Sequence, residues 1–553
     1  MSLKTLVDTR PSSHSLDTSL SPSYGCSTIS TFSSGVRYIQ RALLGFDSSN
    51  PYASLAVTGF KRLSLAESKC YINYLPVELL REIFMLCLPY ERWTLPMSAF
   101  TLRPLYPPRQ LILSQVCSYW RRVALCFPDL WSTITIISPA LYHIPMVKLW
   151  LERSRQLPLT LYINGHNYFN GQSESRDWEK ACTSITVIED VINLLRPHVR
   201  RWKSITFILS PPLSPHHPWV VTLPPGCLSL LESLISLPSD CFSLLEVVHF
   251  DVGGHFAIRY FEMIMQIRDM FLSSSNQLKE VEWKTKDCIH RALSFPINLT
   301  HLSGDFALDM SFFNGLSQLK NLRCLRLSGD SRWDRFPLQP PLTLYHLHTL
   351  DLRATEFAPP LLNLIDTPNL KVLAIGNHLT DDDYPVLLSF LARCRCDLTA
   401  FSYFDFSGES SDLGFWKDLF SSPHVGSLSE LNVESRNADA LLTVLSWTNP
   451  DRPILPLLNR LWIRTFRCSV GPLFDMIEYR VHHFQPPSGP ALSEGLFDGF
   501  ATFLPSAERS LCIRTDYLQN NDSHTLAELN KLIERNASGH RVISVPSIIT
   551  TWY

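Results

Sequence analysis

Residues 322–327 read LRCLRL, and the same order of apolar and polar positions returns at 347–352 (LHTLDL), 370–375 (LKVLAI), 398–403 (LTAFSY), 428–433 (LSELNV) and 458–463 (LNRLWI). We call this six-residue pattern the repeat phrase; its first, fourth and sixth positions are apolar or aromatic. Successive phrases start 23 to 30 residues apart, close to the spacing of leucine-rich repeats. Each phrase predicts a short strand, and stacked strands share a continuous core that one unit could not bury. We therefore predict an α/β fold with an irregular, curved leucine-rich-repeat solenoid of parallel strands.

Looser copies of the repeat phrase begin at Trp202, Leu245 and Leu278. Together with the six clean copies, they extend the predicted array over residues 134–515. The alternative is an ordinary α/β protein whose strands and helices are rich in leucine. The six clean phrases repeat the same order of residues at similar spacing along the chain, which favours the array.

The repeat phrase also predicts a binding surface. Because successive side chains of a strand point to opposite faces, the third and fifth positions lie opposite the core positions. In a curved array that opposite face is the concave binding surface. The residues that we expect there to contact a target protein are Glu280, Glu282, Arg326, Asp351, Glu430, Asn432, Arg460 and Trp462.

A different pattern precedes the array. Residues 71–89 read YINYLPVELLREIFMLCLP, in which Pro76 suits the first turn of a helix and Pro89 closes it. Apolar residues between them follow the period of an amphipathic helix. Residues 113–131, LSQVCSYWRRVALCFPDLW, resume that period up to Pro128. The residues that we expect on one apolar face of this second helix are Val116, Cys117, Trp120, Val123 and Ala124. These segments predict two or three short helices around one small core.

The order of residues in this segment resembles the F-box. The residues that carry the resemblance are Leu75-Pro76, Glu78, Ile83-Phe84, Val116-Cys117, Trp120-Arg121 and Pro128-Asp129-Leu130-Trp131. The wider chain is similar to F-box proteins with divergent repeats from mushroom-forming (basidiomycete) fungi. That similarity rests on LWLERSRQLPLTLYI (149–163), RRWKSITFIL (200–209) and FDMIEYRV (474–481).

The resemblance implies that the helical segment docks onto the small adaptor subunit of an SCF-type cullin–RING ubiquitin ligase. Exposed apolar side chains on short helices need a partner to cover them, which agrees with that role. We expect Trp120 in the core and Trp131 nearer the rim. The residues expected on the adaptor-facing side or completing the module are Leu75, Pro76, Leu79, Ile83, Phe84, Val116, Trp120 and Trp131.

Composition argues against several other classes of protein. The net charge of −2 among 553 residues gives no general attraction to nucleic acid, and Arg121-Arg122 lacks a wider basic context. Only 21 of the 553 residues are glycine, well below the average share of about 7%. Few glycines are therefore available to form phosphate-binding loops. No membrane-length apolar run and no secretory signal are visible. The 14 cysteines are spread along the chain, which favours reduced thiols and a location in the cytoplasm, the nucleus or both.

We find no nucleotide-binding, serine-hydrolase or zinc-protease motif, and we expect no enzyme activity and no cofactor. Cys394 and Cys396 have no second pair at zinc-ligand spacing, so we expect structural thiols and no metal. The histidine pairs of the chain, at 216–217, 346/348 and 482–483, are similarly incomplete.

The domains that we predict are a Ser/Thr-rich disordered tail (1–68), the F-box helical module (69–133), the repeat array (134–515) and a C-terminal helix or cap (516–553). The favoured function is the substrate-recognition subunit of the ligase, with the array binding a protein target. The alternatives are a non-degradative F-box scaffold and an α/β enzyme with an incidental helical hairpin. Co-purification with the adaptor and cullin separates the first two.

Overall fold

The computed structural model describes residues 75–88, 109–165, 174–209, 227–238, 241–252, 258–274, 276–285, 295–306, 308–329, 341–355, 358–376, 383–405, 413–446, 454–458, 460–469, 471–476, 510–519, 531 and 543–544. The chain divides into two units after residue 71, and the second unit comprises residues 72–553. The described residues all belong to the second unit, and the tail predicted at 1–68 lies outside them.

The second unit is built on one large parallel sheet. Its described strands follow chain order from β1 to β16, except that β8 and β10 form a separate two-stranded sheet. The strands of the large sheet are β1 (Thr133–Ile137), β2 (Leu159–Asn164), β3 (Trp202–Ile208), β4 (Val247–Asp251), β5 (Glu280–Lys284), β6 (His301–Asp305), β7 (Cys324–Gly329), β9 (Thr349–Thr355), β11 (Val372–Gly376), β12 (Ala400–Asp405), β13 (Glu430–Asn437), β14 (Arg460–Ser469), β15 (Ser510–Gln519) and β16 (Ile543–Ser544). The small sheet pairs β8 (Leu342–Thr343) with β10 (Ile365–Asp366).

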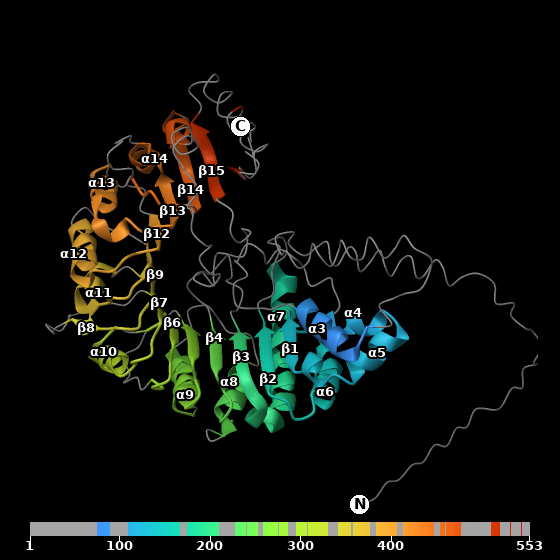
Figure 1. The fold of residues 1–553 in the computed structure, drawn as a ribbon. Helices are drawn as coiled ribbons and strands as arrows, with labels where there is room; N and C mark the ends of the chain where they lie inside the picture. The colour runs from blue at the N-terminus through green and yellow to red at the C-terminus, as the bar shows by residue number, and fades with distance from the viewer. Residues whose placement is uncertain are drawn as a thin grey trace, which may run out of the picture. The chain divides into compact units, whose positions relative to one another are not determined.

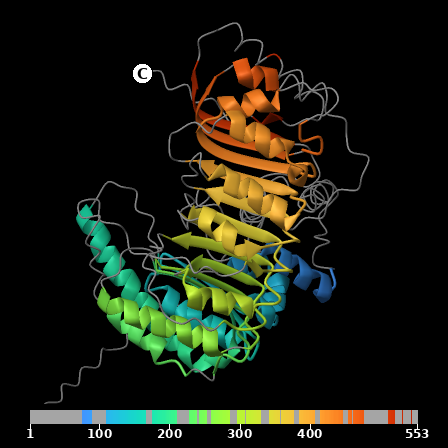
Figure 2. The same ribbon diagram turned by 90° about the vertical axis from the view of Figure 1, so that its left-hand side faces the viewer.

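Helices connect most of these strands and lie on one face of the large sheet, along the outside of its curve (Figures 1 and 2). They are α6 (His143–Arg153), α7 (Glu174–Leu195), η4 (Arg196–Arg201), α8 (Cys227–Ile235), α9 (Ile258–Ser274), α10 (Met310–Ser317), α11 (Ala358–Leu364), α12 (Tyr384–Cys394), α13 (Leu413–Ser421), η6 (Pro423–Val425) and α14 (Asp439–Leu445). The inner face of the curved sheet carries no described helix (Figure 1). We call this inner face the open face.

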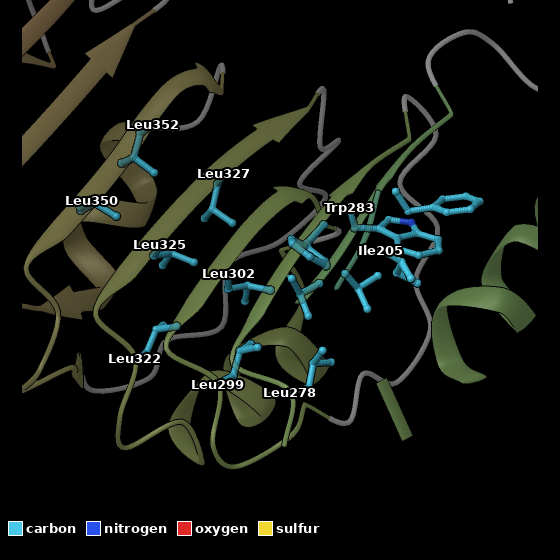
Figure 3. Close-up of a cluster of buried hydrophobic side chains, with 14 of the residues drawn as sticks. Ile205, Leu278, Trp283, Leu299, Leu302, Leu322, Leu325, Leu327, Leu350 and Leu352 are labelled. Carbon is cyan, nitrogen blue, oxygen red and sulfur yellow. The ribbon is translucent and has the colours of Figure 1, made fainter. Parts of the chain in front are cut away.

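The repeat phrase sets the register of the sheet. Its fourth positions are direct partners in neighbouring strands, and all of them are buried. Sixth positions form a second buried row beside them, and Figure 3 shows several side chains of both rows. The fourth-position row is Ile134, Leu161, Ile205, Val248, Val281, Leu302, Leu325, Leu350, Leu373, Phe401, Leu431 and Leu461. The α/β class and the parallel repeat sheet predicted from the phrases are confirmed.

Among the described strands of the large sheet, β1, β2, β6, β15 and β16 were not among the nine predicted from repeat phrases. Strand β6 has Gly304 at its sixth position, so the phrase there lacks its last apolar residue. Strand β15 crosses the predicted end of the array at residue 515, and β16 pairs with it inside the segment predicted as a helical cap. The parallel sheet therefore continues beyond 515. Most of the segment 516–553, predicted as a C-terminal helix or cap, lies outside the described residues.

Before the sheet come α3 (Val77–Cys87), α4 (Arg109–Gln115), α5 (Ser118–Leu125) and η3 (Pro128–Trp131). Pro76 is the N-cap of α3, directly before the first turn in which the sequence had placed it. The second segment is not one continuous helix, because Cys117 has an extended backbone and caps α5 with its sulfur, 3.4 Å from the Trp120 backbone N. Val116 and Cys117 thus separate α4 from α5 and do not continue the helical face expected for them.

Trp131 joins these helices to the sheet. Its side chain is fully buried, and its indole N–H donates to the Ala124 carbonyl of α5 at 2.8 Å. Trp131 also occupies the first position of a repeat phrase whose fourth and sixth residues, Ile134 and Ile136, are buried in β1. The expectation that Trp131 lies at the rim is therefore wrong, because this residue belongs to both cores.

Gly304 is required by the close approach of two strands. Its φ is +137°, a conformation that side chains rarely adopt. A Cβ atom at this position would lie 1.8 Å from the carbonyl oxygen of Trp283 in β5. Because the obstacle is backbone, it can move only with the strand itself.

We predict that Gly304→Ala lowers the free energy of unfolding by about 2 kcal/mol or more, since a strained backbone alone costs about 1–3 kcal/mol. Urea denaturation followed by circular dichroism measures the change. Gly426→Ala is the matched control, because its Cβ would lie 3.4 Å from its nearest neighbour, the Pro423 oxygen. Equal effects of the two substitutions would contradict this account of β6.

Candidate functional site

Helix α3 has one buried and one exposed apolar face. Leu80, Phe84 and Leu88, spaced four residues apart, are buried in the core. The other face exposes Leu79 by 52% and Leu86 by 77%, with Ile83 partly exposed between them. These three residues stand at i, i+4 and i+7, which places them along one side of the helix. We call Leu79, Ile83 and Leu86 the α3 stripe.

Helix α5 and the start of α3 hold each other in place. The Tyr119 hydroxyl donates to the Leu75 carbonyl at 3.0 Å, and the rings of Phe84 and Trp120 lie 5.1 Å apart. The Arg81 guanidinium lies 5.2 Å from the centre of the Phe127 ring. The α3 stripe is thereby presented on a helix whose opposite side is packed.

The eight residues predicted for docking divide into two groups. Pro76 and Leu79 are exposed, and Leu75, Ile83 and Val116 are partly exposed. Phe84, Trp120 and Trp131 are buried, so Phe84 does not lie on an outward-facing surface as expected. The burial pattern of α3 explains this difference: Phe84 falls on the stripe of Leu80 and Leu88, one residue away from the outward-facing Ile83. Leu86, which the sequence motif did not single out, is the most exposed member of the α3 stripe.

The second candidate surface is the open face of the sheet. All eight residues predicted for target binding lie in strands at positions between buried core residues, so the predicted alternation is confirmed. Asp351 and Asn432 are buried, whereas the other six are partly exposed. Trp462 is one of the partly exposed residues, which excludes a register error of one residue in β14.

Charged residues of the open face are paired with each other, both between neighbouring strands and within one strand. Arg460 Nη1 lies 3.6 Å from Glu430 Oε2. Asp351 accepts from Arg353 Nη2 at 2.5 Å and lies 3.9 Å from Arg326 Nε. Arg353 was not predicted because it is the seventh residue counted from Leu347, and the repeat phrase has six. It lies one alternation step, two residues, beyond the fifth position. The same step would have found three further charged residues of this face, Lys284, Glu434 and Arg464.

His249 of β4 forms the centre of a charged cluster on this face. Its side chain is 6% exposed; Nε2 lies 3.2 Å from Glu280 and Nδ1 lies 2.8 Å from Glu282. Lys284 Nζ lies 2.5 Å from the second carboxylate oxygen of Glu282. Glu280 and Glu282 were predicted to face a target, but each also holds one nitrogen of the imidazole. His249 itself is the fifth residue of the looser phrase that begins at Leu245.

The pKa values in this cluster depend on one another. Burial alone lowers the pKa of His249, but the carboxylates of Glu280 and Glu282 outweigh it, so the pKa lies above the ordinary 6.5. Burial alone raises the pKa of Glu282, but His249 and Lys284 together hold it well below its usual range. The cluster is therefore most favourable with a protonated imidazole between two ionised carboxylates.

Cys394 and Cys396 are both buried and free. The Cys394 sulfur accepts from the Thr367 backbone N–H at 3.2 Å, and burial raises the pKa of Cys396 to about 12. Such a thiol is neither a ready nucleophile nor a ready metal ligand. Across the described segments, no group of three or more His, Cys, Asp or Glu residues is placed to hold a metal ion.

Comparison with known proteins adds no relative. A scan against protein-family models found no match for this chain, and a search of curated proteins found none either. Within the described part of the chain, none of the helices combines the length and apolar character needed to cross a membrane.

We predict that the stabilising effect of His249 decreases as pH rises. Because its folded pKa is raised, its contribution is fully present below the unfolded value of about 6.5 and is lost as pH rises through the higher folded value. The difference in unfolding free energy between the wild type and His249→Gln should be larger at about pH 6 than at about pH 9. Urea denaturation at the two pH values measures it.

The exposed His346 provides the control, since His346→Gln should leave the unfolding free energy almost unchanged at both pH values. A His249→Gln difference that grows with pH would refute the protonated arrangement.

Proposed function

We propose that this protein is the substrate-recognition subunit of an SCF-type cullin–RING ubiquitin ligase. Helices α3 to α5 bind the small adaptor subunit and, through it, the cullin, while the open face of the repeat sheet binds a protein to be ubiquitinated. The protein itself transfers no ubiquitin and acts in the cytoplasm, the nucleus or both. The proposal rests on the F-box resemblance of residues 72–131 together with the two surfaces described above.

The observation that carries the proposal is the α3 stripe. Two of its leucines are 52% and 77% exposed, and a partly exposed isoleucine lies between them. Keeping this apolar surface in water costs free energy that a binding partner would recover. Exposed Met85 and Leu125 add apolar surface on α3 and α5. An apolar stripe on a helix that is packed on its other side favours docking into a groove of another protein.

The repeat sheet supports the second half of the proposal. Its open face spans many strands and presents aromatic side chains beside charged side chains that are held in ion pairs, between strands at Glu430–Arg460 and Glu434–Arg464 and within β9 at Asp351–Arg353. A rigid surface of this kind suits recognition of a protein better than a reaction on a small molecule, because the side chains are spread along the array. Net charge gives no reason to expect a nucleic-acid partner.

We predict that Leu79→Ala combined with Ile83→Ala weakens adaptor binding at least tenfold. Truncating hot-spot residues at an interface costs about 2 kcal/mol or more, and tenfold corresponds to about 1.4 kcal/mol. The melting temperature should stay close to that of the wild type, because the core side of α3 is untouched. Calorimetric titration of the full chain with purified adaptor measures the affinity.

Ile297→Ala is the matched control: this residue is 66% exposed but lies in the repeat array, so adaptor affinity should not change. If the double variant binds the adaptor as tightly as the wild type does, the proposed docking surface is wrong. If the wild-type chain itself does not bind the adaptor, the ligase role is wrong.

A further inference from the structure

Two polar side chains of the open face lie next to each other without partners. Ser402 of β12 and Asn432 of β13 are direct register partners, at the fifth positions of consecutive repeat phrases. They are 1% and 6% exposed, respectively. Among the described residues, neither Ser402 Oγ nor Asn432 Oδ1 has a hydrogen-bond partner.

Such a pair is unusual in a folded protein. Nearly all buried polar side-chain atoms are hydrogen-bonded, because desolvating them without a partner costs free energy. Phe401, Tyr403, Leu431 and Val433, which flank the pair along their strands, are core residues. Ser402 and Asn432 therefore point away from the core, to the open face, where their polar atoms are covered, so a ligand reaches them when the neighbouring side chains move aside.

The surroundings of the pair define what the ligand can be. On one side the row continues to Ala374, whose side chain ends at Cβ, and on the other side to Trp462. Two ion pairs, Glu430–Arg460 and Glu434–Arg464, flank Trp462 along β13 and β14. Since these charged groups already neutralise each other, a charged ligand group here would lose its hydration without gaining a counter-ion.

We propose that Ser402 and Asn432 bind the side-chain carboxamide of an asparagine or glutamine in an extended segment of the target protein. A carboxamide is neutral, and its N–H groups donate to Asn432 Oδ1 while its oxygen accepts from the Ser402 hydroxyl. Trp462 offers a flat apolar surface beside it. The inference rests on the proposed role of the open face in target binding and adds the class of residue that it recognises.

A chemical reason favours selectivity at this position. A site built to form hydrogen bonds rejects an analogue that lacks them more strongly than an apolar site rejects an extra group. Leucine, which is similar in size but apolar, would leave both protein atoms unmatched. Glutamate, which is similar in shape to glutamine, would bring an unpaired charge and no N–H donor.

The test uses the full chain and four pools of acetylated, amidated heptapeptides with random flanks and a fixed central residue. The central residue is Gln, Asn, Glu or Leu, and the amount of each pool retained by the immobilised protein is measured. Wild type should retain the Gln or the Asn pool at least tenfold more than the Glu and Leu pools. Ser402→Ala and Asn432→Ala should each lose this preference.

Melting temperature provides the second measurement. Because it removes an atom that has no partner, Ser402→Ala should melt at or above the wild-type temperature. Thr206→Val is the matched control: Thr206 Oγ1 is also buried and unpartnered, but it lies in β3, far along the same row. That variant should keep the preference for Gln or Asn.

Equal retention of the four pools, or retention of none, overturns the inference. A melting temperature several degrees lower in Ser402→Ala also overturns it, since the hydroxyl would then have a partner within the chain. The adaptor-binding variant Leu79→Ala/Ile83→Ala should keep the peptide preference. Failure of adaptor docking and failure of carboxamide recognition are thereby measured separately.

Discussion

The structure depends on parallel strands that pair in register, so that equivalent apolar residues form one unbroken row. A single five- or six-residue strand cannot bury its own apolar face, and each strand here relies on the strands on both sides and on the helix that returns the chain. The fourth-position row runs from Ile134 in β1 to Leu461 in β14 without a polar interruption. A one-residue shift in any strand would move its core residues onto the open face.

Trp131 extends that constraint to the helices that precede the sheet. It ends the helical segment, donates a hydrogen bond to α5 and begins the first repeat phrase. The guanidinium of Arg153, in α6, lies 4.4 Å from the centre of its ring. The surface proposed for the adaptor is therefore built on the same hydrophobic core as the sheet, rather than on an independently folded module.

On the open face, side chains of opposite charge are paired with each other. Its acidic and basic residues are held in ion pairs within and between strands, and His249 lies between two carboxylates. Paired charges contribute little net attraction, but they hold their side chains in fixed positions, so binding selectivity there comes from hydrogen bonding and shape. That arrangement agrees with the small net charge of the whole chain.

The sequence alone predicted the nine strands that carry a repeat phrase and the face to which their residues point, because both follow from local alternation and from a repeat spacing that is visible along the chain. It did not predict β1, β2, β6, β15 or β16. It also predicted the start of α3 at Pro76, because proline acts locally. Only the tertiary structure decided that His249 lies between Glu280 and Glu282, that Trp131 and Phe84 are buried, and that β6 needs a glycine. Burial and most of these contacts depend on how closely neighbouring elements approach, and that distance is set by packing between segments far apart in the chain.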